Sequence, residues 1–455
     1  MPEPTLPEAI HSLAHLDLEQ LLFPVLIQLA IIIAVARLFA VLARKVGQPS
    51  AVGEIIAGLL LGPSLFGWLF PETSAIIFQP HLEGVPQALA NAAFPKIFMV
   101  LAQLGLIFLL FLIGLEFEFS HLKQHGRSAF AISFMGIALP LALGSALATL
   151  IHPYLENGPN GKPVPLVGMA LFLAVAMSIT AIPILGRMMI ELGMNRTRLG
   201  AITITAAAID DAAGWILLAT VQAIVRSEFQ IVQTLIMIGE TIAFGLFVLF
   251  VLRPILIRYF NKCLKQNRGE LGVTPLAALI VVLMICAITT NAIGIFAIFG
   301  AFILGAALSD QVEFRQVVIA KLSDIVTAFF LPVFFTYTGL RTTVGAVDGL
   351  TMWLICGAVL ATAMLGKLGG CMIAARYSGF SMKESGIIGI MMNTRALMEL
   401  IVINIGYDLG VIPKSVFAML VLMAIATTIM TTPIMLRLRY GTEIEAPIRE
   451  SGFLK

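Results

Sequence analysis

The chain has 455 residues, of which 59% are hydrophobic and 12% are charged, about half of the roughly 25% charge of soluble domains. Apolar runs long enough to cross a bilayer recur from Leu21 to Leu436, which excludes a soluble globular protein. These runs do not alternate with polar residues, which excludes a transmembrane barrel, and a net charge of +2 gives no reason to expect a nucleic-acid partner. We therefore expect an all-α, multi-pass protein of the lipid bilayer.

In chain order, the apolar runs predict thirteen transmembrane helices, each about 20 residues long. The boundary near Gly294 is the least marked. The expected spans are 21–42, 51–69, 96–115, 128–151, 164–190, 199–225, 231–253, 273–289, 293–309, 320–340, 351–375, 383–405 and 414–436.

Basic residues support this count, because cytoplasmic loops of membrane proteins collect Lys and Arg. With the N-terminus outside, the inner loops hold twenty of the 28 basic residues and the outer loops hold five. The segment 1–20 contains neither Lys nor Arg and is expected outside, whereas the tail 437–455 is expected in the cytoplasm. We expect the host to be the bacterial inner (plasma) membrane or another energised membrane.

Thirteen spans divide into six, one and six. The ranges 21–230 and 273–436 would then be two inverted repeats, with 231–253 as a linker helix. Inverted repeats are a common plan of secondary transporters, in which equivalent helices are interrupted near the middle of the membrane. The plan therefore predicts a broken helix at the same place in each half.

The fifth span of each half has a polar centre with helix-breaking residues. Span 164–190 contains Ser178 and Thr180 just before Pro183, which cannot donate a helical hydrogen bond. Span 383–405 has Gly389 before the polar residue Asn393. We predict discontinuous helices at both places; simple kinks are the alternative interpretation.

Two adjacent carboxylates, Asp210 and Asp211, lie at the centre of the sixth span. Ionisable residues inside a membrane are costly and usually functional. Neighbouring residues of a helix point about 100° apart, so one aspartate can face a buried base and the other an ion or a proton. Lys367, at a similar depth in the eleventh span, is the expected partner, either for coupling or as a purely structural ion pair.

Other charges have local explanations. Arg395 and Glu399 are four residues apart on one helix and are expected to pair. We interpret the pair as architectural, with a direct part in ion coupling as the alternative. Glu54 is expected at the interface, paired with Arg44 or Lys45.

The hydroxyls of Ser178 and Thr180 are hard oxygen ligands suited to Na⁺, Li⁺ or K⁺, and would complete a shell begun by Asp211. A carboxylate removed from water holds a proton more tightly, so protons and cations compete for the same oxygens. If the carrier reorients only when this site is occupied, the competition enforces exchange. We expect a secondary transporter that exchanges Na⁺ for H⁺ by alternating access, without a cofactor. A second proton at Asp210 and Lys367 would make exchange electrogenic.

Three other functions are alternatives for a chain with these features. An intramembrane aspartyl protease needs two carboxylates that face each other, normally on separate spans. A sodium-coupled solute symporter of similar inverted-repeat plan would need a cavity for an organic substrate. A channel or a non-transporting sensor is a further alternative. The chain has no HExxH, Walker or dinucleotide-binding motif, and we expect no enzyme.

Taken together, GQPSAVGEIIAGLLLGPSLFG (47–67), SITAIPIL (178–185), the Asp210–Asp211 pair and NTRALMELIVINIGYDLG (393–410) resemble the second monovalent cation:proton antiporter family. That family includes bacterial Na⁺/H⁺ antiporters and the membrane domains of glutathione-gated potassium efflux systems. The resemblance implies a thirteen-helix fold, a dimerisation domain, and a mobile core domain with two crossed, broken helices. It therefore implies a homodimer, with a role in pH homeostasis.

Residue by residue, the resemblance implies that Asp211 binds the cation or the proton and that Asp210 pairs with Lys367. Thr180 would supply the hydroxyl at the first helix crossing, and Asn393 the polar group at the second. Adjacent aspartates resemble the electrogenic members of the family. The sequence departs from the pattern at Ile179, where many relatives have a second hydroxyl, and at Ala396, where glycine is usual. It also lacks the nucleotide-binding tail of the potassium efflux systems, which argues against that subgroup.

Overall fold

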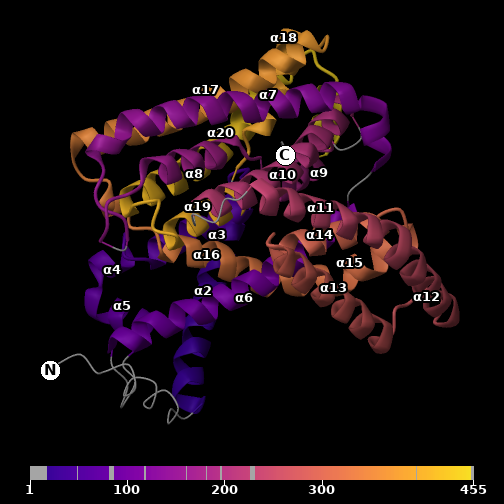
Figure 1. The fold of residues 1–455 in the computed structure, drawn as a ribbon, viewed down its shortest axis with the longest axis horizontal. Helices are drawn as coiled ribbons and strands as arrows, with labels where there is room; N and C mark the ends of the chain where they lie inside the picture. Colours follow the sequence, from indigo (N-terminus) through magenta and orange to yellow (C-terminus); the bar gives the residue numbers. More distant parts are fainter. Residues whose placement is uncertain are drawn as a thin grey trace. The chain divides into compact units, whose positions relative to one another are not determined.

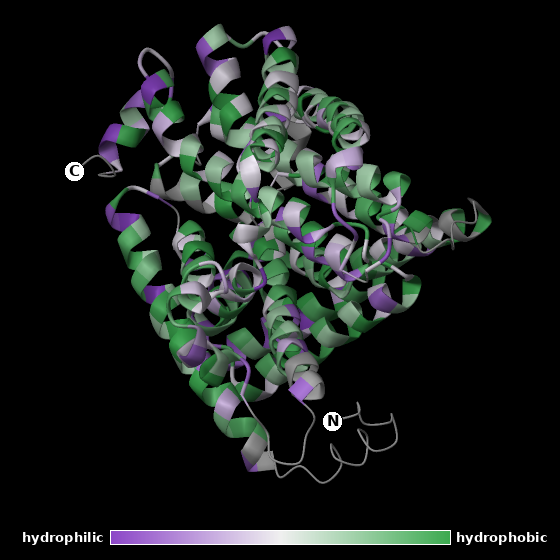
Figure 2. Ribbon diagram, turned by 90° about the vertical axis from the view of Figure 1, so that its left-hand side faces the viewer, coloured by the Kyte–Doolittle hydropathy of each residue, from purple (hydrophilic) through white to green (hydrophobic). Residues whose placement is uncertain are grey.

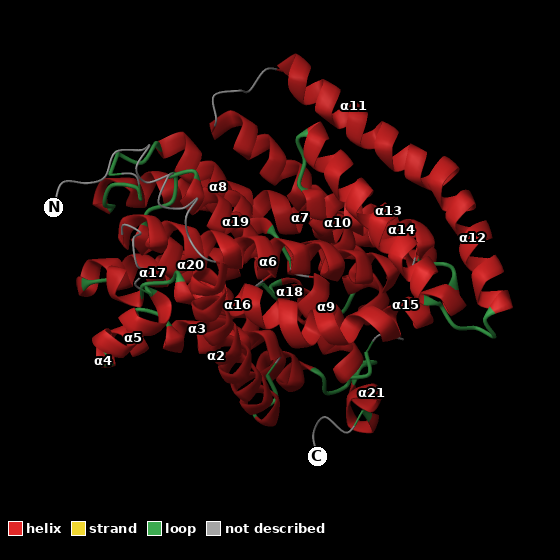
Figure 3. Cartoon of the chain, turned by 90° about the horizontal axis from the view of Figure 1, so that it is seen from below, coloured by secondary structure: helices red, strands yellow, loops and turns green. Residues whose placement is uncertain are grey.

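The computed structural model describes residues 18–48, 50–80, 87–116, 119–159, 161–180, 182–194, 197–225, 231–395 and 397–451. Within these ranges the secondary structure is helical and contains no strand (Figure 3). The predicted all-α class is confirmed. Most of the predicted external segment 1–20 and the family departure at Ala396 lie outside the described residues.

Ten helices of the described part are long and apolar enough to cross a membrane, and two shorter apolar helices accompany them. Hydrophobic residues run along the helices, whereas hydrophilic residues gather at helix ends and loops (Figure 2). The chain is therefore a multi-pass membrane protein, and its exact number of spans stays a prediction.

The chain forms two compact units. The first comprises residues 1–106 and 324–345. It contains α2 (Leu18–Lys45), α3 (Ser50–Leu61), α4 (Phe66–Leu69), α5 (Pro71–Phe78), the first part of α6 (Gln87–Glu116), the π-helical turn η3 (Val326–Phe330) and α16 (Leu331–Leu340).

Helix α3 packs closely against both α2 and α16. A methyl group on Gly53 would lie 2.2 Å from the Phe39 carbonyl oxygen, and one on Gly58 would lie 2.3 Å from that of Thr336. This close packing buries Glu54, whose side chain lies 3.6 Å from Nη1 of Arg37. Glu54 is therefore buried between helices and has Arg37 as an ion-pair partner, whereas its expected position at the membrane interface stays a prediction.

The second unit comprises residues 107–323 and 346–455. It contains the end of α6, α7 (Phe119–Ile151), η1 (His152–Tyr154), α8 (Leu166–Ser178), α9 (Ile182–Glu191), α10 (Arg198–Val225), α11 (Ile231–Phe247), η2 (Val248–Leu252), α12 (Arg253–Gln266), α13 (Val273–Ile293), α14 (Ala297–Leu308), α15 (Val312–Ile325), α17 (Gly349–Tyr377), α18 (Met382–Met392), α19 (Leu397–Asp408), α20 (Lys414–Leu438) and α21 (Glu445–Glu450). In the sequence, the short η4 (Val344–Ala346) contains the last residues of the first unit and the first residue of the next segment of the second.

Two helix ends of this unit bear on the sequence predictions. Gly294, with φ of +100°, ends α13 in the left-handed region, where glycine is favoured, so the predicted break between the eighth and ninth spans is confirmed. The linker helix, expected to end at residue 253, continues through the π-helical turn η2 into α12 and ends at Gln266 (Figure 3). The basic residues from Arg253 onward interrupt the apolar sequence, but the backbone stays helical through them.

Helices α7 and α17 lie side by side along the second unit (Figure 1). Their contact is tight, because a methyl group on Gly370 would lie 2.5 Å from the Met135 carbonyl oxygen and one on Gly366 3.0 Å from Cα of Pro140. Lys367 lies between these glycines on α17. The close approach places its long side chain among the neighbouring helices rather than in lipid.

Candidate functional site

Two broken helices meet in the second unit. Helix α8 ends at Ser178 and α9 begins at Ile182, whereas α18 ends at Met392 and α19 begins at Leu397. Both breaks fall within the spans in which they were predicted. The Thr180 hydroxyl donates to the Met392 carbonyl oxygen at 2.7 Å and so joins the two interruptions directly. The expected pair of crossed, discontinuous helices is confirmed.

The carbonyl end of α8 faces two buried cations. Arg395 donates from Nη1 to the Ala176 carbonyl oxygen at 2.9 Å and from Nη2 to that of Met177 at 2.7 Å. Lys367 Nζ donates to the carbonyl oxygen of Ser178. The last carbonyls of a helix lack partners within the helix and carry partial negative charge. The two cations therefore stabilise the interrupted end of α8.

Asp210 is fully partnered. Its Oδ2 accepts from Nζ of Lys367 at 2.7 Å and from the backbone N–H of Thr180 at 2.9 Å. Its Oδ1 accepts from the Ser133 hydroxyl of α7 at 3.4 Å. The predicted ion pair with Lys367 is present, and both side chains are fully buried. Asp210 thus links α10 to α17 and to the break before α9.

Asp211 is adjacent but differently surrounded. It is 3% exposed, and its Oδ1 is buried without a hydrogen-bond partner among the described residues. An unsatisfied buried carboxylate oxygen is costly, so such a group is expected to bind something that the protein itself does not provide. The two aspartates therefore have different roles: one is held in a network, and the other offers an unused oxygen.

The hydroxyls predicted to surround Asp211 have other partners in this arrangement. Ser178 Oγ donates to the Ala174 carbonyl oxygen at 2.6 Å, and Thr180 Oγ1 donates to Met392 as described above. A hydroxyl that donates its proton still has lone pairs that can accept a cation. The oxygen shell expected around Asp211 thus stays a prediction.

Several polar atoms in and just after the second break lack hydrogen bonds among the described residues. Asn393 accepts through Oδ1 from Arg395 Nε at 3.4 Å, while its buried Nδ2 has no hydrogen-bond partner among the described residues. Glu399 lies 3.8 Å from Nη1 of Arg395, which confirms that these side chains pair. Both Glu399 oxygens nonetheless lack a hydrogen bond within the described part of the chain. Arg395 is therefore held mainly by carbonyl groups.

Two residues of this region were not predicted. Ser133 reaches Asp210 from α7, and Thr428 of α20 accepts the backbone N–H of Arg395 at 3.3 Å. Each is a hydroxyl within an apolar span, which was the available signal in the sequence. Hydroxyls are common in membrane helices, where they often bond to their own backbone, so the signal is weak without a known neighbour.

The sequence is similar to that of known membrane proteins over most of its length. The family model described as "Sodium/hydrogen exchanger, transmembrane" matches residues 30–438. The Na⁺/H⁺ antiporter NhaS4 of Synechocystis sp. is 36% identical over 419 residues, which cover 91% of this chain and 97% of that protein. The Na⁺/H⁺–K⁺ antiporter GerN of Bacillus cereus is 28% identical over 426 residues, covering 93% of this chain and 98% of that protein.

Longer relatives and one solved structure are also similar. Cation/H⁺ antiporter 18 of Arabidopsis thaliana is 35% identical over 416 residues, which are 90% of this chain but 48% of that protein. The sodium proton antiporter MjNhaP1 of Methanocaldococcus jannaschii superimposes with a TM-score of 0.64 at 14% identity, covering 95% of this chain and all of that one. At this identity the similarity establishes the fold alone.

Proposed function

The chain belongs to the sodium/hydrogen exchanger family, and we propose that it exchanges Na⁺ for protons across a membrane by alternating access. The observation that carries this proposal is the contrast at the centre of α10, where Asp210 is saturated by partners and the adjacent Asp211 keeps a buried, unpartnered oxygen. Relatives named for Na⁺ and for K⁺ exchange both occur, so Li⁺ and K⁺ are further candidate substrates.

We propose that protons and cations compete for Asp211. Burial favours the neutral, protonated carboxyl group, and a desolvated cation can replace the proton by neutralising the same charge. Thr180, Ser178 and Asn393, at the two helix breaks, are the proposed additional ligands, with oxygen atoms that suit a hard cation. Exchange follows if the protein reorients only when Asp211 carries either a proton or a cation.

Asp210 and Lys367 are proposed to hold the broken helices together and to take part in coupling. If their ion pair opens during the cycle, Lys367 can release a proton and exchange becomes electrogenic. The direct contact at 2.7 Å and the complete burial of both groups support this coupling. Equal turnover at different membrane potentials would argue against it.

Arg395 and Glu399 are proposed to be architectural. Arg395 donates to three carbonyl oxygens, of Ala176, Met177 and Ala363, and so fixes the interrupted end of α8. Glu399 supplies a nearby negative charge at 3.8 Å without a hydrogen bond to the guanidinium. The three carbonyl partners of Arg395 favour a structural role for its side chain. For Glu399 the proposal rests on its position beside Arg395, since its two buried oxygens lack hydrogen bonds among the described residues, as Oδ1 of Asp211 does.

We further propose a homodimer in an energised membrane, such as the bacterial inner membrane, with the N-terminus outside and the C-terminus in the cytoplasm. The asymmetric distribution of basic residues supports this orientation. Exchange in this setting would serve pH homeostasis.

The test uses purified protein in liposomes that contain a trapped pH dye. After an acidic interior has been imposed, Na⁺, Li⁺ or K⁺ is added outside in turn. The wild type is expected to raise the internal pH in response to its substrate cations, which also ranks them. Asp211→Asn is expected to lose this response at least a hundredfold, because the amide cannot bind a proton and a cation in turn.

The outcomes discriminate between roles. Survival of exchange in Asp210→Asn would leave Asp210 and Lys367 with a structural role alone. An inactive wild type that is correctly folded, or an active Asp211→Asn, would refute the proposed exchange at Asp211.

A further inference from the structure

The end of the linker helix carries an unusual concentration of positive charge. Residues 253–268 contain five basic residues and no acidic one, and they form α12 and the turn that follows it. Arg253 pairs with Asp310 of the same unit. Arg258, Lys262 and Lys265 are exposed, and within the described residues none of them forms an ion pair or a hydrogen bond. These three side chains are here called the basic face.

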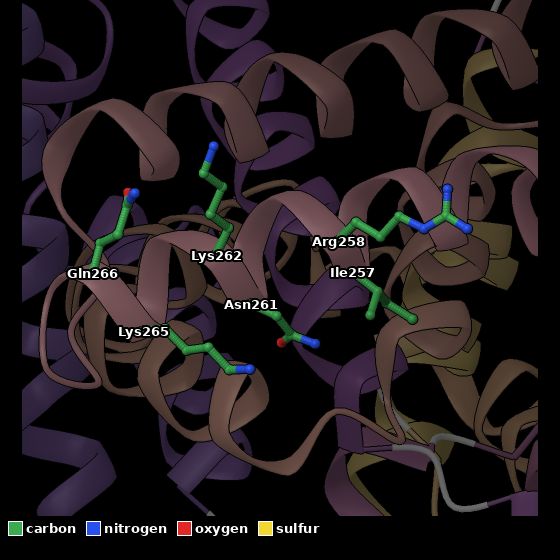
Figure 4. A pocket seen from close by; sticks show the side chains of 6 residues that line it. All are labelled: Ile257, Arg258, Asn261, Lys262, Lys265 and Gln266. Atoms are coloured by element: carbon green, nitrogen blue, oxygen red, sulfur yellow. The ribbon is translucent and has the colours of Figure 1, made fainter.

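The spacing of the basic face brings its charges together. Residues three and four positions apart are neighbours on a helix, so Lys262 lies beside both Arg258 and Lys265. Two adjacent rows of side chains project from α12, with a hollow of about 500 Å³ between and beside them (Figure 4). The hollow is lined by Ile257, Arg258, Asn261, Lys262, Lys265 and Gln266. Such a lining of cations and amides suits a phosphate group.

The apolar surface next to the basic face indicates where that phosphate comes from. Phe250, Ile255 and Tyr259, just before and beside the basic face on the same continuous helix, are 74%, 57% and 40% exposed. Exposed aromatic and aliphatic side chains of this kind contact acyl chains in a membrane protein. The basic face and the exposed apolar side chains thus lie next to each other on one helix, so a single lipid could contact the first with its head group and the second with its acyl chains.

The length of the helix places the basic face at the membrane surface. From Ile231 to Gln266 the helix has 36 residues (17 in α11, 5 in η2 and 14 in α12). At about 1.5 Å per residue it is roughly 54 Å long, whereas the hydrocarbon core is about 30 Å thick. The apolar part can therefore span the core while the basic face lies at the level of the head groups.

We infer that the basic face binds the phosphodiester head group of an anionic phospholipid, whose acyl chains pack along the exposed apolar side of the same helix. The site is separate from Asp211 and does not depend on the proposed transport.

The inference can be tested by measuring lipid binding to delipidated, full-length protein with native mass spectrometry. Dioleoyl phosphatidylglycerol, dioleoyl phosphatidylcholine and inorganic phosphate are titrated separately. The wild type is expected to bind the anionic lipid saturably and much more tightly than the other two. Arg258→Gln/Lys262→Gln/Lys265→Gln should weaken that binding about a hundredfold, because each basic residue near an anionic lipid contributes about a fivefold effect.

A matched control removes three exposed basic residues elsewhere, as Lys321→Gln/Arg437→Gln/Arg449→Gln. It is expected to bind phosphatidylglycerol like the wild type. If the triple variant on α12 does not fold, Lys262→Gln alone should still weaken binding about fivefold. Unchanged binding in the α12 variants, equal loss in the control, or equally tight binding of inorganic phosphate or phosphatidylcholine would each overturn the inference.

Discussion

Asp210 and Asp211 are neighbours in sequence, yet their carboxylates meet different surroundings. One turns toward α7, α17 and the break before α9, where Ser133, Lys367 and Thr180 each supply a hydrogen bond. The carboxylate of Asp211 forms no hydrogen bond to this network and keeps its Oδ1 without a partner among the described residues. The angle of about 100° between successive helical side chains is sufficient to produce the difference.

The buried ion pair between Lys367 and Asp210 is expected to stabilise the folded protein. In Lys367→Gln the Asp210 carboxylate stays buried without its cation, and loss of one partner of a buried pair costs about 3–5 kcal/mol. We expect a markedly lower unfolding temperature in detergent. Asp210→Asn/Lys367→Gln should regain much of the loss, because it removes both charges, and the exposed-site control Lys321→Gln should match the wild type. Equal stability of Lys367→Gln and wild type would show that the ion pair is not needed.

Much of this site could be predicted from single residues. Asp210, Asp211, Lys367 and Arg395 stand out because charges are costly in a membrane and must find partners. Sequence could not show that Arg395 binds the end of α8, since its partners are backbone carbonyls that every residue possesses. The burial of Glu54 beside Arg37 could not be predicted for a related reason, because burial depends on which helices approach it.

At the scale of single elements, the two helix breaks depend on each other. The Thr180 hydroxyl joins them through the Met392 carbonyl oxygen, and both groups are buried. Thr180→Val should lower stability by about 1–3 kcal/mol, because it leaves a buried carbonyl unpaired. It should also weaken cation-driven exchange. Thr180→Ser keeps the hydroxyl and should retain both properties; a stable, active Thr180→Val would remove Thr180 from the site.

Helix α17 offers a matched pair of adjacent glycines. A methyl group on Gly370 would lie 2.5 Å from the Met135 carbonyl oxygen of α7, whereas one on Gly369 would meet nothing within 4 Å. Gly370→Ala should therefore destabilise the protein and disturb the position of Lys367. Gly369→Ala should be neutral or stabilising by up to about 1 kcal/mol, because alanine favours the helix. Thermal unfolding of the two variants tests this, and similar behaviour of both would refute the close α7–α17 contact.

Helix boundaries were less predictable than helix positions. The break at Gly294 could be anticipated because glycine is favoured in the left-handed region that ends α13. The end of the linker helix could not, because hydropathy reports where an apolar run stops and not where the backbone leaves the helical conformation. Pro254, at the start of α12, follows the π-helical turn η2 without ending the helix.

For the whole molecule, composition and charge placement were sufficient to predict an all-helical membrane protein. The apolar runs and the broken helices have counterparts in the structure, and the chain matches its exchanger family over residues 30–438. The division into two inverted repeats stays a prediction, as does the count of thirteen spans.

The central claim is that one buried carboxylate holds either a proton or a cation. The most direct measurement is calorimetric Na⁺ binding to purified protein at several pH values, in buffers of different ionisation enthalpy, so that released protons are counted. In acidic conditions the wild type should release about one proton per bound Na⁺. Its Na⁺ affinity should there fall about tenfold for each unit by which the pH is lowered, because protons occupy the same carboxylate. Asp211→Asn should show neither effect. Na⁺ binding to wild type without proton release at any pH, or unchanged proton release in Asp211→Asn, would contradict the account.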